Sequence, residues 1–309
     1  MSKHSQRKAY GETLVELGAK NPNVVALEAD LGKSTMSIMF QEAYPERFFE
    51  MGIAEQNTLS TAAGLAVSGK IPFCSSFAVF ISGRAFDQIR QTISIGKLNV
   101  KICGSSSGLS DFGDGSTHQT IEDIATMSAI PNMTVLCPVD ANETKAAVRA
   151  AAEIPGPVYI RVVRNDVTDY IPEGEPFALG QPRVLKDGSD VAIFAHGTMV
   201  EAAMEASEQL AKEGISAKVV NVSTLKPFND EAIVELAKGC KGVVAAEEHS
   251  RIGGLSAKVA FALRKSAIPM DYVAVEDVFG QSAHGVEELM EYYGLTPAHI
   301  VEKAKDLVK

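Results

Sequence analysis

Short apolar runs alternate with helical segments along the chain, and this alternation restricts the fold more than any other feature. Residues 24–27 (VVAL), 99–104 (NVKICG) and 158–163 (VYIRVV) predict buried strands, because they are short and almost continuously apolar. The segments around them predict helices at residues 5–19, 84–95, 121–128 and 141–152, and a strand at residues 134–137. Strands separated by helices pair in parallel, so this part of the chain predicts an α/β sheet with helices on both faces.

The same alternation returns in the second half of the chain, after a segment that lacks it. Residues 167–183 are rich in proline and glycine and show no period, which is typical of a linker. Beyond the linker the pattern predicts strands at residues 190–195, 217–222, 242–247 and 272–275, and helices at residues 200–213, 230–237, 253–265 and the C-terminal end. Because 309 residues suffice for two domains of ordinary size, we expect α/β domains at residues 1–166 and 184–309.

Composition excludes several classes of partner. The net charge of −10 argues against binding to nucleic acid or to an anionic membrane, since either would need a basic surface. The N-terminal residues (MSKHSQRKAYGETL) lack the apolar core of a signal peptide, and no apolar run approaches the roughly 18 residues of a membrane span, so we expect a cytoplasmic protein. The four cysteines have no CxxC or metal-ligand spacing and predict small buried residues in a reducing compartment: Cys74, Cys103, Cys137 and Cys240.

Residues 48–87 carry an isolated carboxylate in apolar surroundings. Two phenylalanines lead to a glycine turn and Glu55, and a helix of small residues is expected at residues 58–67. A short strand and then Phe77 and Phe80, three residues apart, follow. An acid at such a place is either bound at the helix N-terminus or held for chemistry. The pattern alone favours the first interpretation.

The motifs of this stretch resemble a known family. GIAEQN, then AAGLA, then a strand and F-x-x-F are similar to the pyrimidine-binding domain of transketolases and their relatives, which use thiamine diphosphate. The resemblance implies that Glu55 contacts N1′ of the aminopyrimidine ring and favours the imino tautomer, whose nitrogen takes the proton from the thiazolium C2. It also implies that Phe77 and Phe80 supply aromatic faces for the flat ring.

Residues 28–35 (EADLGKST) place polar groups at the carboxyl end of a predicted strand, where open α/β sheets bind ligands. An ordinary turn with Ser34 as helix N-cap would explain them equally well. Transketolases carry an aspartate and a serine at this spacing. The resemblance therefore implies that Asp30 lies near the cofactor and that Ser34 contacts a sugar phosphate.

The polar loop at residues 105–119 (SSSGLSDFGDGSTHQ) contains two possible motifs. The GDG at residues 113–115, followed later by Asn142, fits the spacing of a thiamine-diphosphate metal motif. It lies in a loop instead of after an apolar strand, so we expect no metal site here. The loop is more similar to the D-G-x-T-H-Q of transketolases. That resemblance implies that Asp114 binds a sugar hydroxyl and that His118 bonds a substrate hydroxyl and helps to move protons.

Arg164 follows a predicted strand, and an arginine there can form two bonds to a phosphate. A surface arginine next to the linker is the alternative, but its position matches the phosphate arginine of transketolases. Two features depart from that family. Ser106 stands where many members have a histidine that contacts the acceptor phosphate, and residues 110–113 differ from the usual loop. Both departures leave the identity of the sugar open.

The second half of the chain resembles the transketolase C-terminal domain, including the EEH at residues 247–249 followed by GGL. For His249 we expect a structural role at a subunit contact. A complete transketolase has another domain, which holds the diphosphate and its metal, and these 309 residues contain no substitute for it. The simplest interpretation is a split enzyme. An N-terminal subunit would hold the diphosphate and a Mg²⁺ or Ca²⁺ ion, in an α2β2 assembly with active sites at the interfaces.

The expected activity is the transfer of a two-carbon ketol unit from a ketose phosphate to an aldose phosphate. Three alternatives stay open. The first is a ketol transferase for an unusual sugar, such as a branched ketose phosphate or a sulfo-sugar. The second is a relative of 1-deoxyxylulose-5-phosphate synthase or of the β subunit of a 2-oxo acid dehydrogenase. The third, of another class, is a non-catalytic regulatory or scaffold subunit, which the presence of Glu55, Asp114, His118 and Arg164 disfavours.

Overall fold

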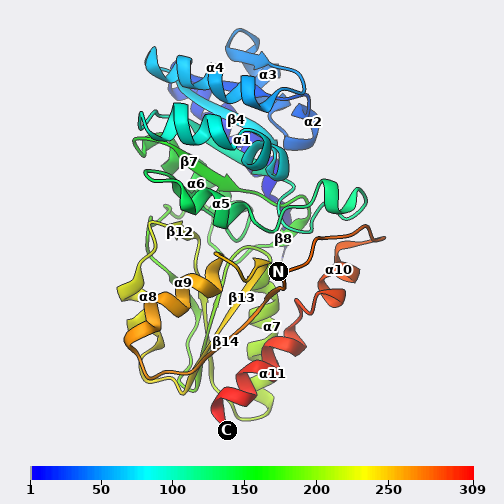
Figure 1. The fold of residues 1–309 in the computed structure, drawn as a ribbon, viewed down its shortest axis with the longest axis vertical. Coiled ribbons are helices and arrows are strands. Elements are labelled where there is room, and N and C mark those ends of the chain that lie inside the picture. The colour runs from blue at the N-terminus through cyan, green and yellow to red at the C-terminus, as the bar shows by residue number, and fades with distance from the viewer. Residues whose placement is uncertain (1) are drawn as a thin grey trace.

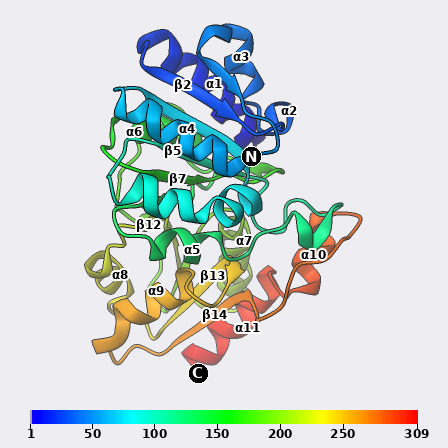
Figure 2. The same ribbon diagram turned by 45° about the horizontal axis from the view of Figure 1, so that its top comes forward.

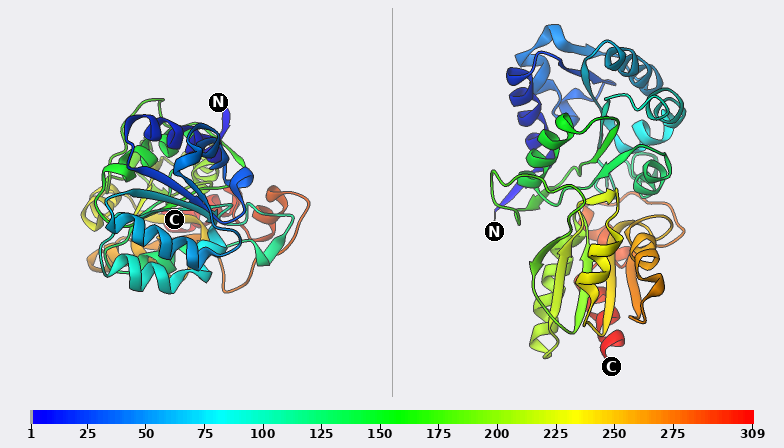
Figure 3. Two further views of the ribbon diagram at one scale, coloured as in Figure 1. Left: turned by 90° about the horizontal axis from the view of Figure 1, so that it is seen from above. Right: turned by 90° about the vertical axis from the view of Figure 1, so that its left-hand side faces the viewer.

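Two β-sheets, each covered by helices, lie one above the other along the long axis of the molecule (Figure 1). This computed structural model describes residues 2–309. Figure 3 shows the two layered units from the side, with the N-terminal end close to the junction between them and the C-terminal end at the far tip of the second unit. The predicted α/β class with two helix-covered sheets is confirmed.

The first sheet has seven strands in the order β12-β6-β7-β5-β4-β2-β3. Six come from the first part of the chain and pair in parallel, and their side chains are almost all buried. Their bounds are β2 (Val24–Glu28), β3 (Phe48–Glu50), β4 (Ile71–Phe77), β5 (Lys101–Ser105), β6 (Thr134–Leu136) and β7 (Val158–Arg161). Because parallel strands point the same way, their carboxyl ends and the loops that follow gather at one edge of the sheet.

Helices cover both faces of this sheet. On one face α1 (Gln6–Lys20) and α6 (Ala141–Glu153) pack side by side, each begun by a side-chain cap, Ser5 for α1 and Asp140 for α6. On the other face lie α4 (Glu55–Val67), two π-helical segments and α5 (Asp123–Ala129). The short helices α2 (Gly32–Thr35) and α3 (Ile38–Ala43) pack against α1. Figure 2 shows α4 and α5 on the face turned toward the viewer.

The second sheet has the order β14-β13-β10-β11-β9, and only β9 is antiparallel to its neighbour. The strands are β9 (Arg183–Lys186), β10 (Val191–Ala195), β11 (Ala217–Asn221), β13 (Gly242–Ser250) and β14 (Met270–Val275). Helices α7 (Met199–Lys212) and α11 (Pro297–Val308) cover one face, and α8 (Asp230–Ala237) and α9 (Leu255–Ala262) cover the other. The remaining helix, α10 (Val286–Tyr292), follows a long loop after β14.

Two short strand pairings join parts of the chain that are distant in sequence. Strand β12 (Thr224–Lys226) belongs to the second part of the chain by sequence, yet it pairs antiparallel with β6 and becomes the edge of the first sheet. Strand β8 (Asp166–Thr168) pairs with β1 (Lys3–Ser5). The sequence pattern predicted neither pairing. Residues 167 and 168, expected to be linker, therefore lie in a strand.

The predicted helix at residues 84–95 is replaced by a longer and looser one. The backbone becomes helical directly after β4 and forms π-helical turns in η2 (Phe80–Arg84) and η3 (Gln88–Ser94). A π-helical turn holds one residue more than an α-helical turn, so the side chains drift around the axis relative to the usual period. Ile89 and Ile93 still face the core, as expected, and are fully buried.

Candidate active site

Glu55 is the first residue of α4, and its side chain is only 1% exposed. Gly52, with φ of +70°, turns the chain from β3 toward the helix, a conformation that glycine adopts without strain. The interpretation that the pattern favoured is wrong, because no hydrogen bond joins this carboxylate to the N-terminus of α4 among residues 2–309. Its Oε2 accepts a hydrogen bond of 2.7 Å from Nη1 of Arg84, a residue of η2 that the sequence analysis did not identify.

Three aromatic rings lie next to this ion pair. Phe77 ends β4 and Phe80 begins η2, and their rings are nearly parallel, with centroids 6.1 Å apart. His118 meets both rings edge-on, at 6.2 Å from Phe77 and 5.2 Å from Phe80. The Arg84 guanidinium lies 4.8 Å from the centre of the Phe80 ring, a cation–π distance. Glu55, Phe77, Phe80 and His118 thus come together, with Arg84 as the link.

The cluster lies at the surface. Arg84 is 46% exposed and Phe80 and His118 are partly exposed, whereas Glu55 and Phe77 are buried beneath them. The His118 Nδ1 is 2.9 Å from the hydroxyl of Thr117, which fixes the orientation of the ring. A flat molecule with a nitrogen at its edge would find aromatic faces and a dry carboxylate here, so the residues fit the pyrimidine end of thiamine diphosphate.

The loop after β2 is built around a buried acid. Glu28 is fully buried, and its oxygens accept hydrogen bonds from the hydroxyls of Thr35 and Ser37 and from the amides of Ala29 and Leu31. Burial raises the pKa of Glu28 to about 7, although these hydrogen bonds oppose the shift. No motif predicted a separate role for Glu28 within the loop. A carboxylate at the end of an apolar strand was the signal that could have identified it.

Asp30 and Ser34 lie in the same loop. Asp30 adopts a left-handed conformation, with φ of +62°, and its backbone N–H donates to the Glu50 carboxylate at 2.9 Å. Ser34 is inside α2, and Leu31 is the N-cap residue, so the alternative interpretation of Ser34 as a cap is wrong. The carbonyl of Ser34 accepts a hydrogen bond of 2.8 Å from Nη1 of Arg7.

Two arginines approach one another near this loop. Burial lowers the pKa of Arg7, and the neighbouring positive charge of Arg164 lowers it further. The Arg7 Nε is buried and has no hydrogen-bond partner among residues 2–309, which is unusual for a charged group. Arg7 lies in no motif that predicted a role for it. Two guanidinium groups with an unpaired donor fit an oxyanion.

Arg164 is paired with an acid from the loop at residues 105–119. Its Nη1 donates to Oδ1 of Asp111 at 2.8 Å, and Asp111 is only 1% exposed. Burial raises the pKa of Asp111, and the nearby Asp114 carboxylate raises it further, whereas Arg164 lowers it. Asp114 itself is exposed. Ser106, at the other departure from the family pattern, is fully buried and its hydroxyl has no partner among residues 2–309.

The loop is anchored by the second unit. The Leu109 N–H donates to Oε1 of Glu248 at 2.6 Å, and the hydroxyl of Thr198 donates to Oε2 of the same carboxylate. Gly108 adopts φ of +65° and lies so close to Glu248 that a Cβ would be 2.4 Å from Oε1. The position of His118 and Asp114 therefore depends on β13 of the second sheet.

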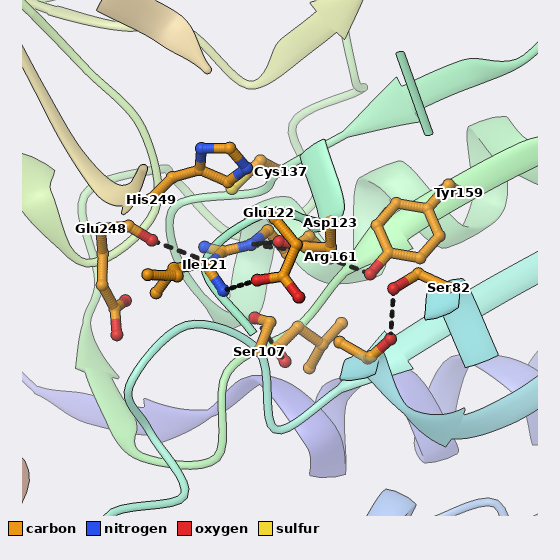
Figure 4. A network of polar contacts seen from close by, with 12 residues as sticks. Ser82, Ser107, Ile121, Glu122, Asp123, Cys137, Tyr159, Arg161, Glu248 and His249 are labelled. Carbon is orange, nitrogen blue, oxygen red and sulfur yellow. Dashed lines mark hydrogen bonds and ion pairs between the residues drawn. The ribbon is translucent and has the colours of Figure 1, made fainter. Parts of the chain in front are cut away.

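A buried ionic network continues this contact (Figure 4). Arg161 and Asp123 are both buried and form an ion pair at 3.1 Å, and Tyr159 donates to the same carboxylate at 2.8 Å. Nη2 of Arg161 donates to the carbonyl of Glu248 at 3.0 Å. His249 is also fully buried, where its Nε2 accepts from the N–H of Ala125, so it joins the two units of one chain.

The structure brings together no metal site among residues 2–309. No group of three or more histidine, cysteine, aspartate or glutamate side chains lies close enough to hold an ion in this part of the chain. Asn142, which had the spacing of a metal motif with Asp114, donates its side-chain amide to the carbonyl of Ile171 at 2.8 Å. Within the same residues no helix is both long and apolar enough to cross a membrane. All four cysteines are buried and free.

Two models of known protein domains match this chain. The model of the transketolase pyrimidine-binding domain matches residues 2–169, more than half of the chain. The chain belongs to the transketolase family. The model of the transketolase C-terminal domain matches residues 180–300, so the resemblance expected from the motifs is confirmed in both halves.

Two relatives and one solved structure have nearly the same length as this transketolase chain. A Methanocaldococcus jannaschii protein, provisionally named as a transketolase C-terminal section, is 46% identical over 308 residues, which cover 98% of this chain and 96% of the relative. The 6-deoxy-6-sulfo-D-fructose transketolase subunit SqwH of Clostridium sp. (strain MSTE9) is 39% identical, over 100% of this chain and 96% of its own. A split gene transketolase solved as an inactive β4 tetramer superimposes with a TM-score of 0.90 at 47% identity and covers 99% of each chain.

Proposed function

We propose that this chain is the C-terminal subunit of a two-chain transketolase, which moves a two-carbon ketol unit from a ketose phosphate to an aldose phosphate. The observation that carries the proposal is the cluster of Glu55, Phe77, Phe80 and His118 at the surface, where a second chain can complete it. Family membership supports the reaction class. The matching length of the relatives supports the division into two subunits.

Each residue of the cluster has a proposed task. Glu55 holds a proton shared with N1′ of the aminopyrimidine ring, and Phe77 and Phe80 hold the faces of that ring. When bound, thiamine diphosphate supplies the carbon nucleophile to which the ketol unit is attached during transfer. Asp30 lies on the cofactor side of the loop. His118 bonds a substrate hydroxyl and moves a proton at the substrate oxygen.

The far end of the substrate is assigned to the arginine pair. Asp114 binds a sugar hydroxyl, Ser34 and Arg164 contact the terminal oxyanion, and Arg7 is added to them because of its unpaired buried Nε. Guanidinium groups suit an oxyanion because their donors are planar and form two parallel bonds.

The partner is proposed to be an N-terminal subunit that binds the diphosphate and a Mg²⁺ or Ca²⁺ ion, in an α2β2 assembly. Ile53, two residues before Glu55, is 76% exposed, and an apolar side chain exposed beside a site is suited to a protein contact. The relative that was solved as a tetramer of β chains alone is inactive, which supports the need for a second chain. A cytoplasmic location belongs to the same proposal and is supported by the four free cysteines.

A sugar other than those of a common transketolase is the second candidate. The relative SqwH acts, by its name, on a sulfo-sugar. Ser106 and residues 110–113 depart from the common pattern at the end of the site assigned to the far end of the substrate.

The proposal is tested by reconstitution. This chain, a candidate N-terminal subunit and their mixture are each assayed for ketol transfer with thiamine diphosphate and Mg²⁺. We expect turnover only in the mixture, together with a complex of both chains in sedimentation or light-scattering measurements. Turnover by this chain alone would contradict the division of the site between two chains.

A further inference from the structure

The oxyanion site assigned to Arg7 and Arg164 contains a negative charge of its own. Asp111 is buried, and its Oδ1 accepts the 2.8 Å bond from Arg164 Nη1. Its Oδ2 is buried and has no partner among residues 2–309. A buried charged oxygen without a hydrogen-bond partner lowers the stability of the fold, so this carboxylate is a candidate for a functional role.

The carboxylate is held firmly in this position. The backbone carbonyl of Asp111 accepts bonds from Nε2 of Gln119, at 3.2 Å, and from the N–H of Gly115, at 3.3 Å. The N–H of Arg164 donates to the hydroxyl of Ser110, the residue before Asp111, at 3.2 Å. The acid and the arginine are therefore fixed to each other by main-chain contacts as well as by their charges.

Two further carboxylates add negative charge near the arginine pair and Asp111. The carboxylates of Asp111 and Asp166 both interact with Arg7, and Asp114 interacts with Asp111. Two carboxylates, Asp111 and Asp166, thus offset the charges of the two guanidinium groups, and a third, Asp114, lies near Asp111. This chain alone offers a site without excess positive charge. Attraction to the guanidinium groups and repulsion from the carboxylates both double for a dianion, so they offset each other for either ion. The cost of removing the ion from water grows with the square of its charge, so a site with balanced charges favours the monoanion.

We propose that Asp111 is a specificity-determining residue, which occupies one donor of Arg164 and makes the arginine site select a singly charged terminal oxyanion, a sulfonate, over a phosphate dianion. The inference rests on the proposed function for its substrate, but the charge selection is a property of this chain. An Asp111→Asn variant keeps the size of the side chain and removes the charge, so it should admit the dianion.

Anion binding to the full chain tests this without any turnover. Dissociation constants for methanesulfonate, a monoanion, and methyl phosphate, a dianion at pH 8, are measured by NMR titration. We expect the wild-type chain to bind methanesulfonate more tightly. Asp111→Asn should bind methyl phosphate about tenfold more tightly than wild type, which corresponds to about 1.4 kcal/mol, with a smaller change for methanesulfonate.

Two variants control the measurement. Asp306→Asn removes the same charge from the exposed end of α11 and should leave both constants unchanged. Arg164→Met should weaken the binding of both anions. Tighter binding of methyl phosphate than of methanesulfonate by the wild-type chain, or no binding of either, would overturn the inference even if Asp111→Asn did not fold. So would an Asp111→Asn variant that kept the wild-type preference.

The assembled enzyme separates failure of this inference from failure of the proposed function. Ketoses with a phosphate or a sulfonate on the terminal carbon are compared as donors. We expect Asp111→Asn to shift the ratio of kcat/KM toward the phosphate through KM. If no sugar is turned over but the chain still prefers methanesulfonate, the proposed function fails and the assignment of the arginine site stands. If both sugars react and the ratio is unchanged, Asp111 does not determine specificity.

Discussion

The Glu55 carboxylate is buried, yet it is held by a single strong partner, the partly exposed Arg84. Because this guanidinium reaches the surface, an occupant of the site can contact the acid from the open side without entering the core. A carboxylate that has to share a proton with a ring nitrogen needs such one-sided access. The carboxylate is only 1% exposed, so little water reaches its remaining sides.

We expect Glu55→Gln to reduce the turnover of the assembled enzyme by at least about 100-fold, because an amide of the same shape cannot take up or release the shared proton. Steady-state ketol transfer with saturating cofactor measures the effect. Glu46→Gln, at an exposed position in η1 (Pro45–Arg47), is the matched control and should behave like wild type. A Glu55→Gln enzyme within a fewfold of wild type would remove Glu55 from the proposed mechanism.

Glu28 makes stability depend on pH. Its pKa is about 7 in the folded state against 4.5 in the unfolded chain, so between these values the folded protein retains a proton that the unfolded chain has released. The free energy of unfolding therefore falls as pH rises through this window, by about 3 kcal/mol for this group.

Glu28→Gln should remove that dependence and stabilise the protein at pH 8 relative to wild type. The amide oxygen can accept from the N–H groups of Ala29 and Leu31 while its nitrogen donates to the hydroxyls of Thr35 and Ser37. Urea unfolding at pH 5 and pH 8 gives the comparison. A difference between variant and wild type that does not change with pH would show that Glu28 is ionised throughout.

Sequence patterns could identify Glu55, Phe77, Phe80 and His118 because short motifs carry them, and the structure brings these four together. They could not identify Arg84 or Arg7. Each acts on a residue distant in sequence, Arg84 on Glu55 and Arg7 on the carbonyl of Ser34. A phosphate contact was predicted for Arg164 from its position after a strand. Its pairing with Asp111 could not be predicted, because it depends on how the loop at residues 105–119 folds.

Among the elements, the loop at residues 105–119 depends on a strand of the other sheet. Its backbone is bonded by Glu248 of β13, which also holds Thr198. The positive φ of Gly108 lets the loop pass close to that carboxylate. No period in the sequence of the loop indicates such an anchor, since the acid lies about 140 residues away.

Glu248→Ala should lower the free energy of unfolding by about 2–4 kcal/mol, because it leaves the buried N–H of Leu109 and the partly buried hydroxyl of Thr198 without an acceptor. Chemical denaturation of the full chain measures the change. Glu276→Ala, in an exposed pair with Arg251, is the control and should cost less than about 1 kcal/mol. Equal losses in the two variants would contradict the anchoring role.

The π-helical turns of η2 and η3 were also beyond the reach of pattern analysis. Their apolar residues repeat closely enough to the helical period to predict an α-helix at residues 84–95, and the extra residue per turn leaves no clear mark in the sequence. This widened backbone carries Phe80 and Arg84. Such turns are frequent at functional sites.

At the scale of the whole molecule, the two sheets are joined by more than the linker. Strand β12 completes the first sheet, and the buried pair of Arg161 and Asp123 lies against the carbonyl of Glu248. We expect the chain to unfold in one cooperative transition, since neither unit keeps all its contacts without the other. Calorimetry and denaturant unfolding followed by two probes test this, and two separate transitions would contradict it.

The overall α/β architecture was predictable because buried strands and helices repeat along the sequence, whereas the exchange of β12 was not. Only three residues form this strand, and Pro227 follows it directly, so the segment is too short for a strand pattern. The pairing depends on the exposed edge of β6, a tertiary feature that no local pattern encodes.

The position of β12 has a consequence for synthesis on the ribosome. The chain emerges from its N-terminal end, so β6 is made about 90 residues before the strand that covers its edge. During that interval the nascent first sheet carries an unpaired edge, which is a site for pairing with other chains. A translational pause between residues 137 and 224 would prolong this exposure, and a pause after residue 226 has left the exit tunnel would not.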